Sequence, residues 1–291
     1  MRQVPTTDGL ELAVHQQGGS GRPTLLCHAN GFHGAVWEPL SRALGDGFER
    51  WALDFRAHGR SVTPEGHVLG WTQFGDDVLA AVDGLELSAG ETLGIGHSMG
   101  GAALLIAEQA RPGTFAGLWL YEPIVPPPHA PLTNDGPNPL ADGAERRRRS
   151  FPSHADALAN FAAKPPFNVL RADALHAYVR HGFAAGEDGA VHLACRPADE
   201  ARIYRSAGAH RAFERLGEVR CPVVVACGRE EPGPALFAPA VADALPEGRL
   251  ERLDPLGHFG PLEAPEIGAR SVRRFAQGLG SARGSAVTPS A

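Results

Sequence analysis

The sequence lacks any apolar run long enough to span a bilayer, and its first residues, MRQVPTTDGLEL, contain no apolar core of the kind found in secretory signals. Positive charge is not in excess, because 33 Asp and Glu oppose 27 Lys and Arg for a formal net charge of −6. These absences argue against a membrane partner and a nucleic-acid partner. We expect a cytoplasmic protein that acts on a small molecule, and a homodimer is compatible with the sequence.

Paired metal-ligand and redox motifs are also missing. The four cysteines (Cys27, Cys195, Cys221 and Cys227) form no CxxC pair, and the 13 histidines form no HExxH motif. Cys27 and Cys227 lie in apolar, strand-like runs, which favours buried free thiols. We expect no metal and no organic cofactor.

What is present is an alternation of strand-like and helix-like segments over 291 residues, of which 43% are hydrophobic. Strands are expected within 10–18, 23–31, 48–59, 91–98, 115–123, 221–228 and 249–254. Helices are expected within 37–45, 71–85, 99–110, 238–248 and 264–280. This alternation predicts βαβ units and an α/β fold, with a mostly parallel central sheet that is covered by helices on both faces.

The stretch from Pro126 to Arg220 interrupts this rhythm with several helical segments and no predicted strand. Its length exceeds that of a plain loop, so we interpret it as an inserted helical cap. The predicted division is a core at 1–125 and 220–279, a cap at 126–219 and a disordered tail at 280–291. The cap aromatics are interpreted first as the core of the cap and second as pocket lining: Phe151, Phe161, Phe167, Tyr178 and Phe183.

The stretch LGIGHSMGGA (93–102) places glycines between a strand-like and a helix-like run. A dinucleotide-binding turn is one interpretation, with Glu122 at about the distance of a ribose-binding acid, but Met99 stands where the third glycine is needed. A nucleophile turn is the other interpretation, because Gly96-His97-Ser98-Met99-Gly100 fits small–x–nucleophile–x–small. The turn would raise the Ser98 hydroxyl to the sheet edge and leave the Met99 N–H available for an oxyanion.

A serine hydroxyl needs a base to act as a nucleophile. His258 lies in RLERLDPLGHFGPLEAPE, after the last predicted strand and before the last predicted helix. We therefore predict His258 as the base that accepts the Ser98 proton.

Four blocks of the sequence resemble the α/β-hydrolase superfamily: HANGFHGAVWEPL (28–40), DFRAHGRS (54–61), GHSMGGA (96–102) and GHFGPLEAPE (257–266). The first departs from the usual H-G-x-P, and Ala57 replaces a usual glycine. The resemblance implies an oxyanion hole formed by the Met99 and Asn30 N–H groups, with Phe32 as a second candidate for the latter. It also implies that Asp54, Arg56 and His58 brace the loop beside the site.

The acid that orients His258 has two main candidates. The resemblance places it in the loop after the 221–228 strand, where GREEPGP offers Glu231 with Glu230 beside it, or one strand earlier, where Glu122 ends LWLYE. Asp254 is a lesser third candidate. Each follows Ser98 and precedes His258 in the chain, so chain order does not separate them.

The resemblance implies a serine hydrolase that cleaves an ester, thioester, lactone or C–C bond of a small-to-medium hydrophobic substrate through an acyl-enzyme on Ser98. Relatives that open epoxides or displace halide carry aspartate at this position. The alternative is a catalytically silent, ligand-binding or non-hydrolytic member of the same fold. The run Arg146–Arg149 suggests anion binding, although four successive helical residues point in four directions.

Overall fold

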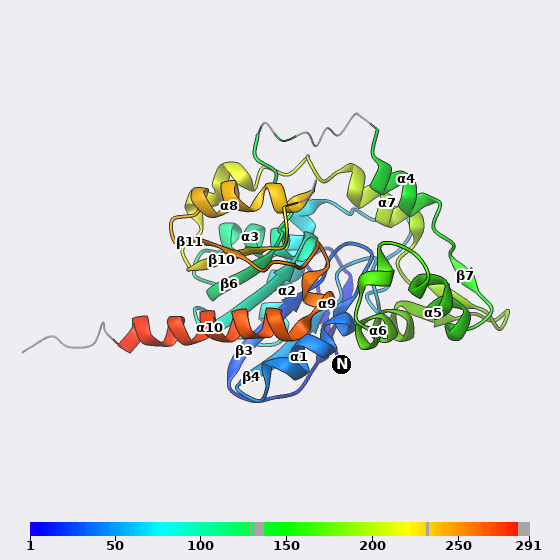
Figure 1. The fold of residues 1–291 in the computed structure, drawn as a ribbon, viewed down its shortest axis with the longest axis horizontal. Helices are drawn as coiled ribbons and strands as arrows, with labels where there is room; N and C mark the ends of the chain where they lie inside the picture. The colour runs from blue at the N-terminus through cyan, green and yellow to red at the C-terminus, as the bar shows by residue number, and fades with distance from the viewer. Residues whose placement is uncertain (129, 131–136, 231–232, 285–291) are drawn as a thin grey trace, which may run out of the picture.

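The computed structural model describes residues 1–128, 130, 137–230 and 233–284. Its centre is an eight-stranded sheet in the order β1-β2-β4-β3-β5-β6-β10-β11 (Figure 1). The strand bounds are β1 Arg2–Pro5, β2 Glu11–Gln16, β3 Arg22–Cys27, β4 Phe48–Leu53, β5 Thr92–His97, β6 Phe115–Tyr121, β10 Val223–Cys227 and β11 Gly248–Arg252. Strand β2 pairs antiparallel with β1 and β4, and all other neighbours are parallel. The predicted mostly parallel sheet is confirmed.

Helices cover both faces of this sheet (Figure 1). Their bounds are α1 Glu38–Leu44, α2 Trp71–Gly84, α3 Met99–Ala110, α8 Ala238–Ala244, α9 Gly260–Glu263 and α10 Pro265–Gly284. Residues of α2, α3 and α8 pack with one face of the sheet, and residues of α1 and α10 pack with the other. Strands β5 and β6 are buried along their whole length, which explains why both read as nearly continuous apolar runs.

The segment between β6 and β10 forms a separate group of elements beside the carboxyl ends of the strands, drawn in green and yellow-green in Figure 1. We call the segment from 126 to 219 the cap. It contains α4 Pro139–Glu145, α5 His154–Ala162, α6 Ala172–Gly182, α7 Pro197–Arg205 and the 3-10 helices Phe167–Val169 and Phe213–Glu218. The side chain of Ser153 accepts a hydrogen bond from the Asp156 N–H at the start of α5 and caps that helix.

The expectation of a cap without strands is wrong. Three short strands, β7 Ser150–Phe151, β8 Phe183–Ala185 and β9 Val191–Leu193, form a small antiparallel sheet in the order β7-β9-β8. Each strand has only two or three residues. A segment of this length is too short to display the alternating pattern from which strands are recognised.

The aromatic side chains of the cap are packed against one another. The five aromatics named from the sequence are all buried, and Phe161 lies with its ring centroid 4.8 to 6.0 Å from those of the other four. Phe32 of the core joins this cluster, 5.3 Å from Tyr178 and 5.7 Å from Phe167. The aromatics thus form the cap core and also its apolar interface with the main domain.

The ends of the chain differ from expectation. Strand β1 has no counterpart among the predicted strands, and α10 continues to Gly284, past the predicted start of the tail at 280. The helix continues because Ser281, Ala282 and Arg283 are compatible with helical structure. The rest of the predicted tail, 285–291, lies outside the described residues.

Within the described ranges, the four cysteines are buried and free. No helix there is both long and apolar enough to cross a membrane, and no group of three or more His, Cys, Asp or Glu side chains is arranged to hold a metal ion.

Candidate active site

The candidate residues follow the carboxyl ends of parallel strands. Asn30 follows β3, Ser98 follows β5, Glu122 follows β6 and His258 follows β11. Because these strands run in the same direction, their carboxyl ends meet at one edge of the sheet, where ligands bind in open α/β sheets.

Ser98 is held in a strained turn between β5 and α3. Its backbone has φ 54° and ψ −115°, a conformation rarely adopted by residues with a side chain. The Ser98 carbonyl oxygen accepts hydrogen bonds from the N–H groups of Gly101, Ala102 and Ile124, and its own N–H donates to the Tyr121 carbonyl oxygen. These bonds fix the turn from both sides, so the strained conformation persists.

Two glycines let the elements around Ser98 approach closely. A Cβ on Gly96 would lie 2.7 Å from the Gly101 Cα, and a Cβ on Gly100 would lie 2.2 Å from the Cys27 carbonyl oxygen. Helix α3 therefore contacts the ends of β5 and β3 through backbone atoms. Side chains two residues before and after Ser98 would thus clash with the neighbouring strand and helix, which is why both positions carry glycine.

His258 is bonded to a buried carboxylate. Its Nδ1 lies 2.7 Å from Oε2 of Glu122, whose side chain is only 2% exposed. The other oxygen of this carboxylate, Oε1, accepts a hydrogen bond of 2.9 Å from the Gly228 N–H. Glu122 has φ 44°, so its backbone is also in the left-handed region. The carboxylate orients the imidazole and favours the tautomer with a proton on Nδ1.

A hydrogen bond from a histidine side chain holds the His258 loop beside the serine turn. The His258 carbonyl oxygen accepts a 2.8 Å hydrogen bond from Nε2 of His97, the residue before Ser98, and the two imidazole rings lie 4.9 Å apart. Burial and the neighbouring His258 hold the pKa of His97 well below its ordinary value, so this ring stays neutral. Among the described residues, no hydrogen bond joins the Ser98 hydroxyl to His258. Such bonds are often long in the absence of substrate and shorten when it binds.

The other acid candidates do not reach His258 in the described structure. Glu230 and Asp254 are exposed. Glu231 lies outside the described residues. Of the carboxylates considered from the sequence, Glu122 is therefore the one whose contact with His258 is present in the part of the chain that the structure describes.

The candidate oxyanion donors differ in their hydrogen bonding. The Phe32 N–H donates to the Ala29 carbonyl oxygen at 3.1 Å, so this group is engaged in the turn and the second candidate is disfavoured. The N–H groups of Asn30 and Met99 make no hydrogen bond to any residue within the described ranges. Both remain available to bind an oxygen atom.

A neutral histidine, His58, braces the Asn30–Gly31 turn from the core side. The Gly31 N–H donates to Nε2 of His58 at 3.0 Å, and Nδ1 of His58 lies 2.8 Å from the Arg56 carbonyl oxygen. A carbonyl oxygen only accepts, so Nδ1 carries the proton and Nε2 is the acceptor. Burial lowers the pKa of His58 to about 4, which keeps the ring neutral and able to accept this bond at neutral pH.

The other two residues expected to brace the loop also have buried partners. Asp54 accepts hydrogen bonds from the N–H groups of Gly34 and Arg60, at 2.6 and 2.7 Å. Burial opposes its ionisation, but the hydrogen bond from His15 and the nearby charges of His15, His33 and His28 together outweigh burial and lower the pKa of Asp54. Arg56 forms a buried ion pair with Asp77 at 2.6 Å. These contacts hold the loop after β4 against the oxyanion turn.

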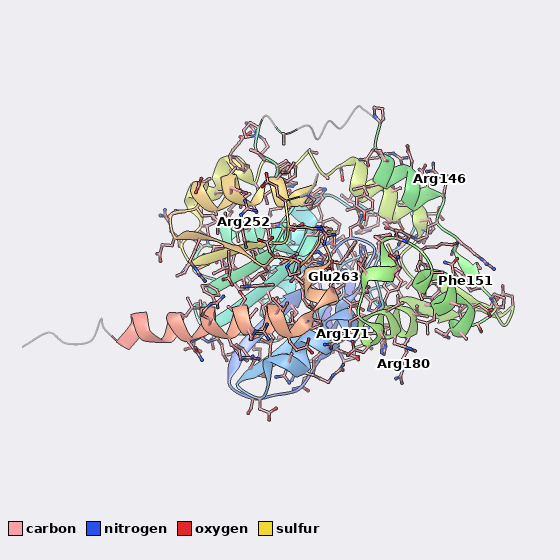
Figure 2. The ribbon with its side chains drawn as sticks, viewed as in Figure 1. Arg146, Phe151, Arg171, Arg180, Arg252 and Glu263 are labelled. Atoms are coloured by element: carbon pink, nitrogen blue, oxygen red, sulfur yellow. The ribbon has the colours of Figure 1, made fainter. Side chains whose placement is uncertain are left out.

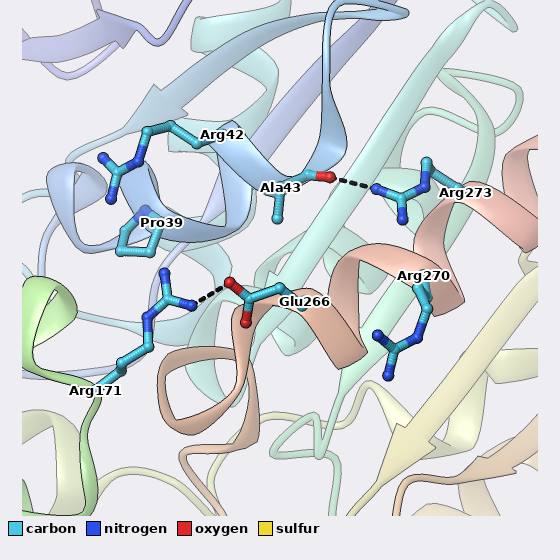
Figure 3. A pocket seen from close by; sticks show the side chains of 7 residues that line it. All are labelled: Pro39, Arg42, Ala43, Arg171, Glu266, Arg270 and Arg273. Carbon is cyan, nitrogen blue, oxygen red and sulfur yellow. Dashed lines mark hydrogen bonds and ion pairs between the residues drawn. The ribbon is translucent and has the colours of Figure 1, made fainter.

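A polar surface groove of about 410 Å³ lies away from these residues, at the junction of α1, the start of α6 and α10 (Figure 3). It is lined by Pro39, Arg42, Ala43, Arg171, Glu266, Arg270 and Arg273. The Arg171 guanidinium of the cap pairs with the Glu266 carboxylate of α10. The backbone N–H of Arg171 donates to the Leu262 carbonyl oxygen at 3.0 Å. The groove therefore marks a polar attachment of the cap to the core, and it contains neither Ser98 nor His258.

One ion pair near the site has no counterpart in the sequence analysis. Arg147 and Glu200, from separate segments of the cap, form an ion pair of 2.8 Å next to Gly31. They are 53 positions apart in the chain, and no motif connects them. Arg147 follows α4 and Glu200 lies in α7, and the packing of α4 against α7 brings the two segments together.

Comparison with known proteins agrees with this architecture. Residues 24–270 match the sequence profile of the alpha/beta hydrolase family. Human monoglyceride lipase is 34% identical over 124 residues, which cover 40% of this chain and 41% of the lipase. The match thus spans well under half of that enzyme.

Solved structures share the fold across nearly the whole chain. E-2-(acetamidomethylene)succinate hydrolase superimposes with a TM-score of 0.75 at 23% identity, covering 95% of this chain and 98% of its own. A thermophilic esterase from Thermogutta terrifontis, solved with malate bound, superimposes with a TM-score of 0.72 at 21% identity, covering 96% and 98%. At these identities the likeness establishes the fold alone.

Gly100→Ala is expected to lower the melting temperature by several degrees, because the added methyl group would meet the Cys27 carbonyl oxygen and force α3 away from β3. Thermal unfolding followed by circular dichroism measures the change. Gly143→Ala is the matched control: it lies in α4 with open space around it, and alanine there should leave the protein as stable or slightly more so. Equal melting temperatures for both variants would contradict the proposed close contact.

Stability is expected to fall as the pH drops from about 6.5 toward 4. Burial lowers the pKa of His33 and His58 to about 4, so the folded state binds fewer protons than the unfolded state in this interval. Between pH 6.5 and 4, protonation of each histidine in the unfolded chain lowers the free energy of unfolding by on the order of 3 kcal/mol. This part of the stability is fully present above pH 6.5 and is lost as the pH approaches 4. Urea unfolding at pH 7 and 4.5 measures the loss. His58→Gln should flatten the profile and exposed His154→Gln should not; identical profiles would contradict the assignment.

Proposed function

The chain belongs to the alpha/beta hydrolase family, and from this premise we propose that it is a serine hydrolase with Ser98 as nucleophile, His258 as base and Glu122 as acid. The observation that carries the proposal is the 2.7 Å contact between His258 Nδ1 and Glu122 Oε2, next to a serine in a strained strand-to-helix turn. A serine, a base and an orienting carboxylate are the three parts of the triad mechanism.

In the proposed acylation step, the Ser98 oxygen attacks the substrate carbonyl carbon while its proton passes to Nε2 of His258. Glu122 stays ionised, holds the Nδ1 proton and stabilises the imidazolium that forms. The negative charge on the carbonyl oxygen is stabilised by the N–H groups of Asn30 and Met99. The intermediate then collapses, the bond to the leaving group breaks, and the leaving group takes the proton from His258.

In the proposed deacylation step, a water molecule attacks the acyl carbon and gives its proton to His258. The second tetrahedral intermediate collapses, the bond to Ser98 breaks, and the serine oxygen regains its proton from the imidazolium. The products are a carboxylic acid and the original leaving group, and the enzyme returns to its starting state. No redox step is involved.

The proposed substrate is a carboxylic ester with a small-to-medium apolar acyl group. The aromatic interface between cap and core supports an apolar binding space, because Phe259, the residue after His258, lies 5.6 Å from Phe32 in the same cluster. The partial similarity to human monoglyceride lipase supports ester chemistry over the thioester, lactone and C–C alternatives.

A fluorophosphonate probe is expected to label the wild-type protein with one covalent adduct, located on Ser98 by peptide mass spectrometry. Ser98→Ala should remain unlabelled and should have no esterase activity on p-nitrophenyl butyrate. Absence of labelling in folded wild-type protein would instead support the catalytically silent alternative. A label on another serine would contradict the assignment of the nucleophile.

Glu122→Gln is expected to lower kcat by about 10² to 10⁴, because the imidazolium loses its carboxylate partner and the tautomer is no longer held. Exposed Glu230→Gln, the same chemical change, should retain wild-type kcat. Glu231→Gln tests the candidate outside the described residues. A large loss in that variant, with near-normal kcat in Glu122→Gln, would move the acid role to the loop after β10.

A further inference from the structure

A buried ion pair in the cap lies against the turn that carries the candidate oxyanion donor. Arg147 stands between α4 and β7, within a run of four arginines. Arg146, labelled in Figure 2 at the end of α4, is exposed, as are Arg148 and Arg149. The Arg147 side chain is only 18% exposed, and its guanidinium lies 5.2 Å from the Phe167 ring centroid. Of the four arginines, it is thus the one directed into the molecule.

The partner of Arg147 is Glu200 of α7. Nη1 of Arg147 lies 2.8 Å from Oε2 of Glu200, whose side chain is 1% exposed. Burial raises the pKa of Glu200, and the adjacent guanidinium opposes this effect. Neither oxygen of this carboxylate accepts a hydrogen bond from another described residue, so the charge of Arg147 is what compensates the burial of Glu200.

The pair touches the oxyanion turn directly. Nδ2 of Asn30 donates a 3.1 Å hydrogen bond to the Glu200 carbonyl oxygen. A Cβ on Gly31 would lie 2.6 Å from Oε1 of Glu200 and 3.4 Å from Nη1 of Arg147, so the ion pair occupies the space above this glycine. His58 accepts the Gly31 N–H from the core side at 3.0 Å. The turn is therefore held between a core histidine and a cap ion pair.

We propose that Arg147 and Glu200 are positioning residues that hold the Asn30 N–H in place for the oxyanion, so that the docked cap completes the oxyanion hole. This inference rests on the proposed function, in which Asn30 is a donor. Oxyanion stabilisation depends on donors fixed at hydrogen-bond distance from the developing charge, and a displacement of about 1 Å costs up to about 100-fold in rate. A contact that fixes the turn by two side chains thus affects turnover more than substrate binding.

Direct binding of a substrate anion by Arg147 is the competing interpretation. It is less favoured because Glu200 already neutralises the guanidinium, and a second carboxylate at the same place would meet the negative charge of Glu200. The two interpretations differ in which kinetic constant changes and for which substrate.

The experiment compares Arg147→Met, Arg147→Lys and the exposed control Arg146→Met, which removes the same charge. Each is assayed with p-nitrophenyl butyrate and with mono-p-nitrophenyl glutarate, a carboxylate-bearing analogue. Positioning predicts that Arg147→Met lowers kcat at least about tenfold for both substrates with KM changed less than about twofold. Arg147→Lys should recover part of the loss, and Arg146→Met should match the wild type.

A second readout does not require activity. Hydrogen–deuterium exchange of the peptide that spans residues 28–33 reports the bonded N–H groups of Gly31 and Phe32. Exchange should be faster in Arg147→Met than in the wild type and unchanged in Arg146→Met. If Arg147→Met unfolds, the double variant Arg147→Met/Glu200→Gln removes the unpaired charge and should fold, yet still show low kcat and faster exchange.

Three outcomes would overturn the proposal. Wild-type kcat in Arg147→Met or in the folded double variant would exclude positioning. A rise in KM confined to the glutarate ester would identify Arg147 as a substrate-binding residue. Unchanged exchange of residues 28–33 would show that the turn does not depend on the pair. Failure of the proposed function is recognised separately, by the absence of a fluorophosphonate adduct on wild-type Ser98.

Discussion

The close backbone contact between helix α3 and the ends of β3 and β5 is the constraint on which the rest of the site depends. Gly100 lies where a methyl group would meet the Cys27 carbonyl oxygen, and Gly96 lies where it would meet Gly101. This contact forces the chain to reverse within one residue, so Ser98 takes a positive φ and projects from the sheet edge. The same edge collects the loops that carry Asn30, Glu122 and His258 because their strands are parallel.

Each ionisable group that is buried near this edge either has a charged or hydrogen-bonding partner or is held in its neutral form. The Glu122 carboxylate is hydrogen-bonded to His258 and to the Gly228 N–H, and Arg56 pairs with Asp77. His58, on the core side of the oxyanion turn, is instead neutral, because burial lowers the pKa of its ring. A neutral ring with a defined tautomer can accept a backbone hydrogen bond, which a protonated ring cannot.

The contacts between the cap and the core include an apolar cluster and several polar attachments, two of which lie in contrasting positions. The apolar attachment is the cluster of Phe32 with Phe167 and Tyr178. One polar attachment, Arg171 with Glu266, lies at the surface, where ion pairs contribute little stability. The other, Asn30 with Glu200, is buried beside the candidate site. The cap is thereby joined to the turn that carries Asn30, whose N–H must be fixed at hydrogen-bond distance from the oxyanion in the proposed chemistry.

The sequence determined the class of fold and the local geometry of the serine turn, because apolar periodicity and glycine spacing are local properties. It also identified Ser98 and His258 as candidates through their places after strands. It left Glu122 and Glu231 unresolved, since chain order is the same for both, and the contact of Glu122 with His258 joins residues 136 positions apart. It missed the short cap strands, which span too few residues for a pattern. It offered Phe32 as a donor, although the turn uses that N–H internally. The inward direction of Arg147 and its pairing with Glu200 were decided only by tertiary packing, because no local rule specifies which of four successive arginines meets a carboxylate from a distant helix.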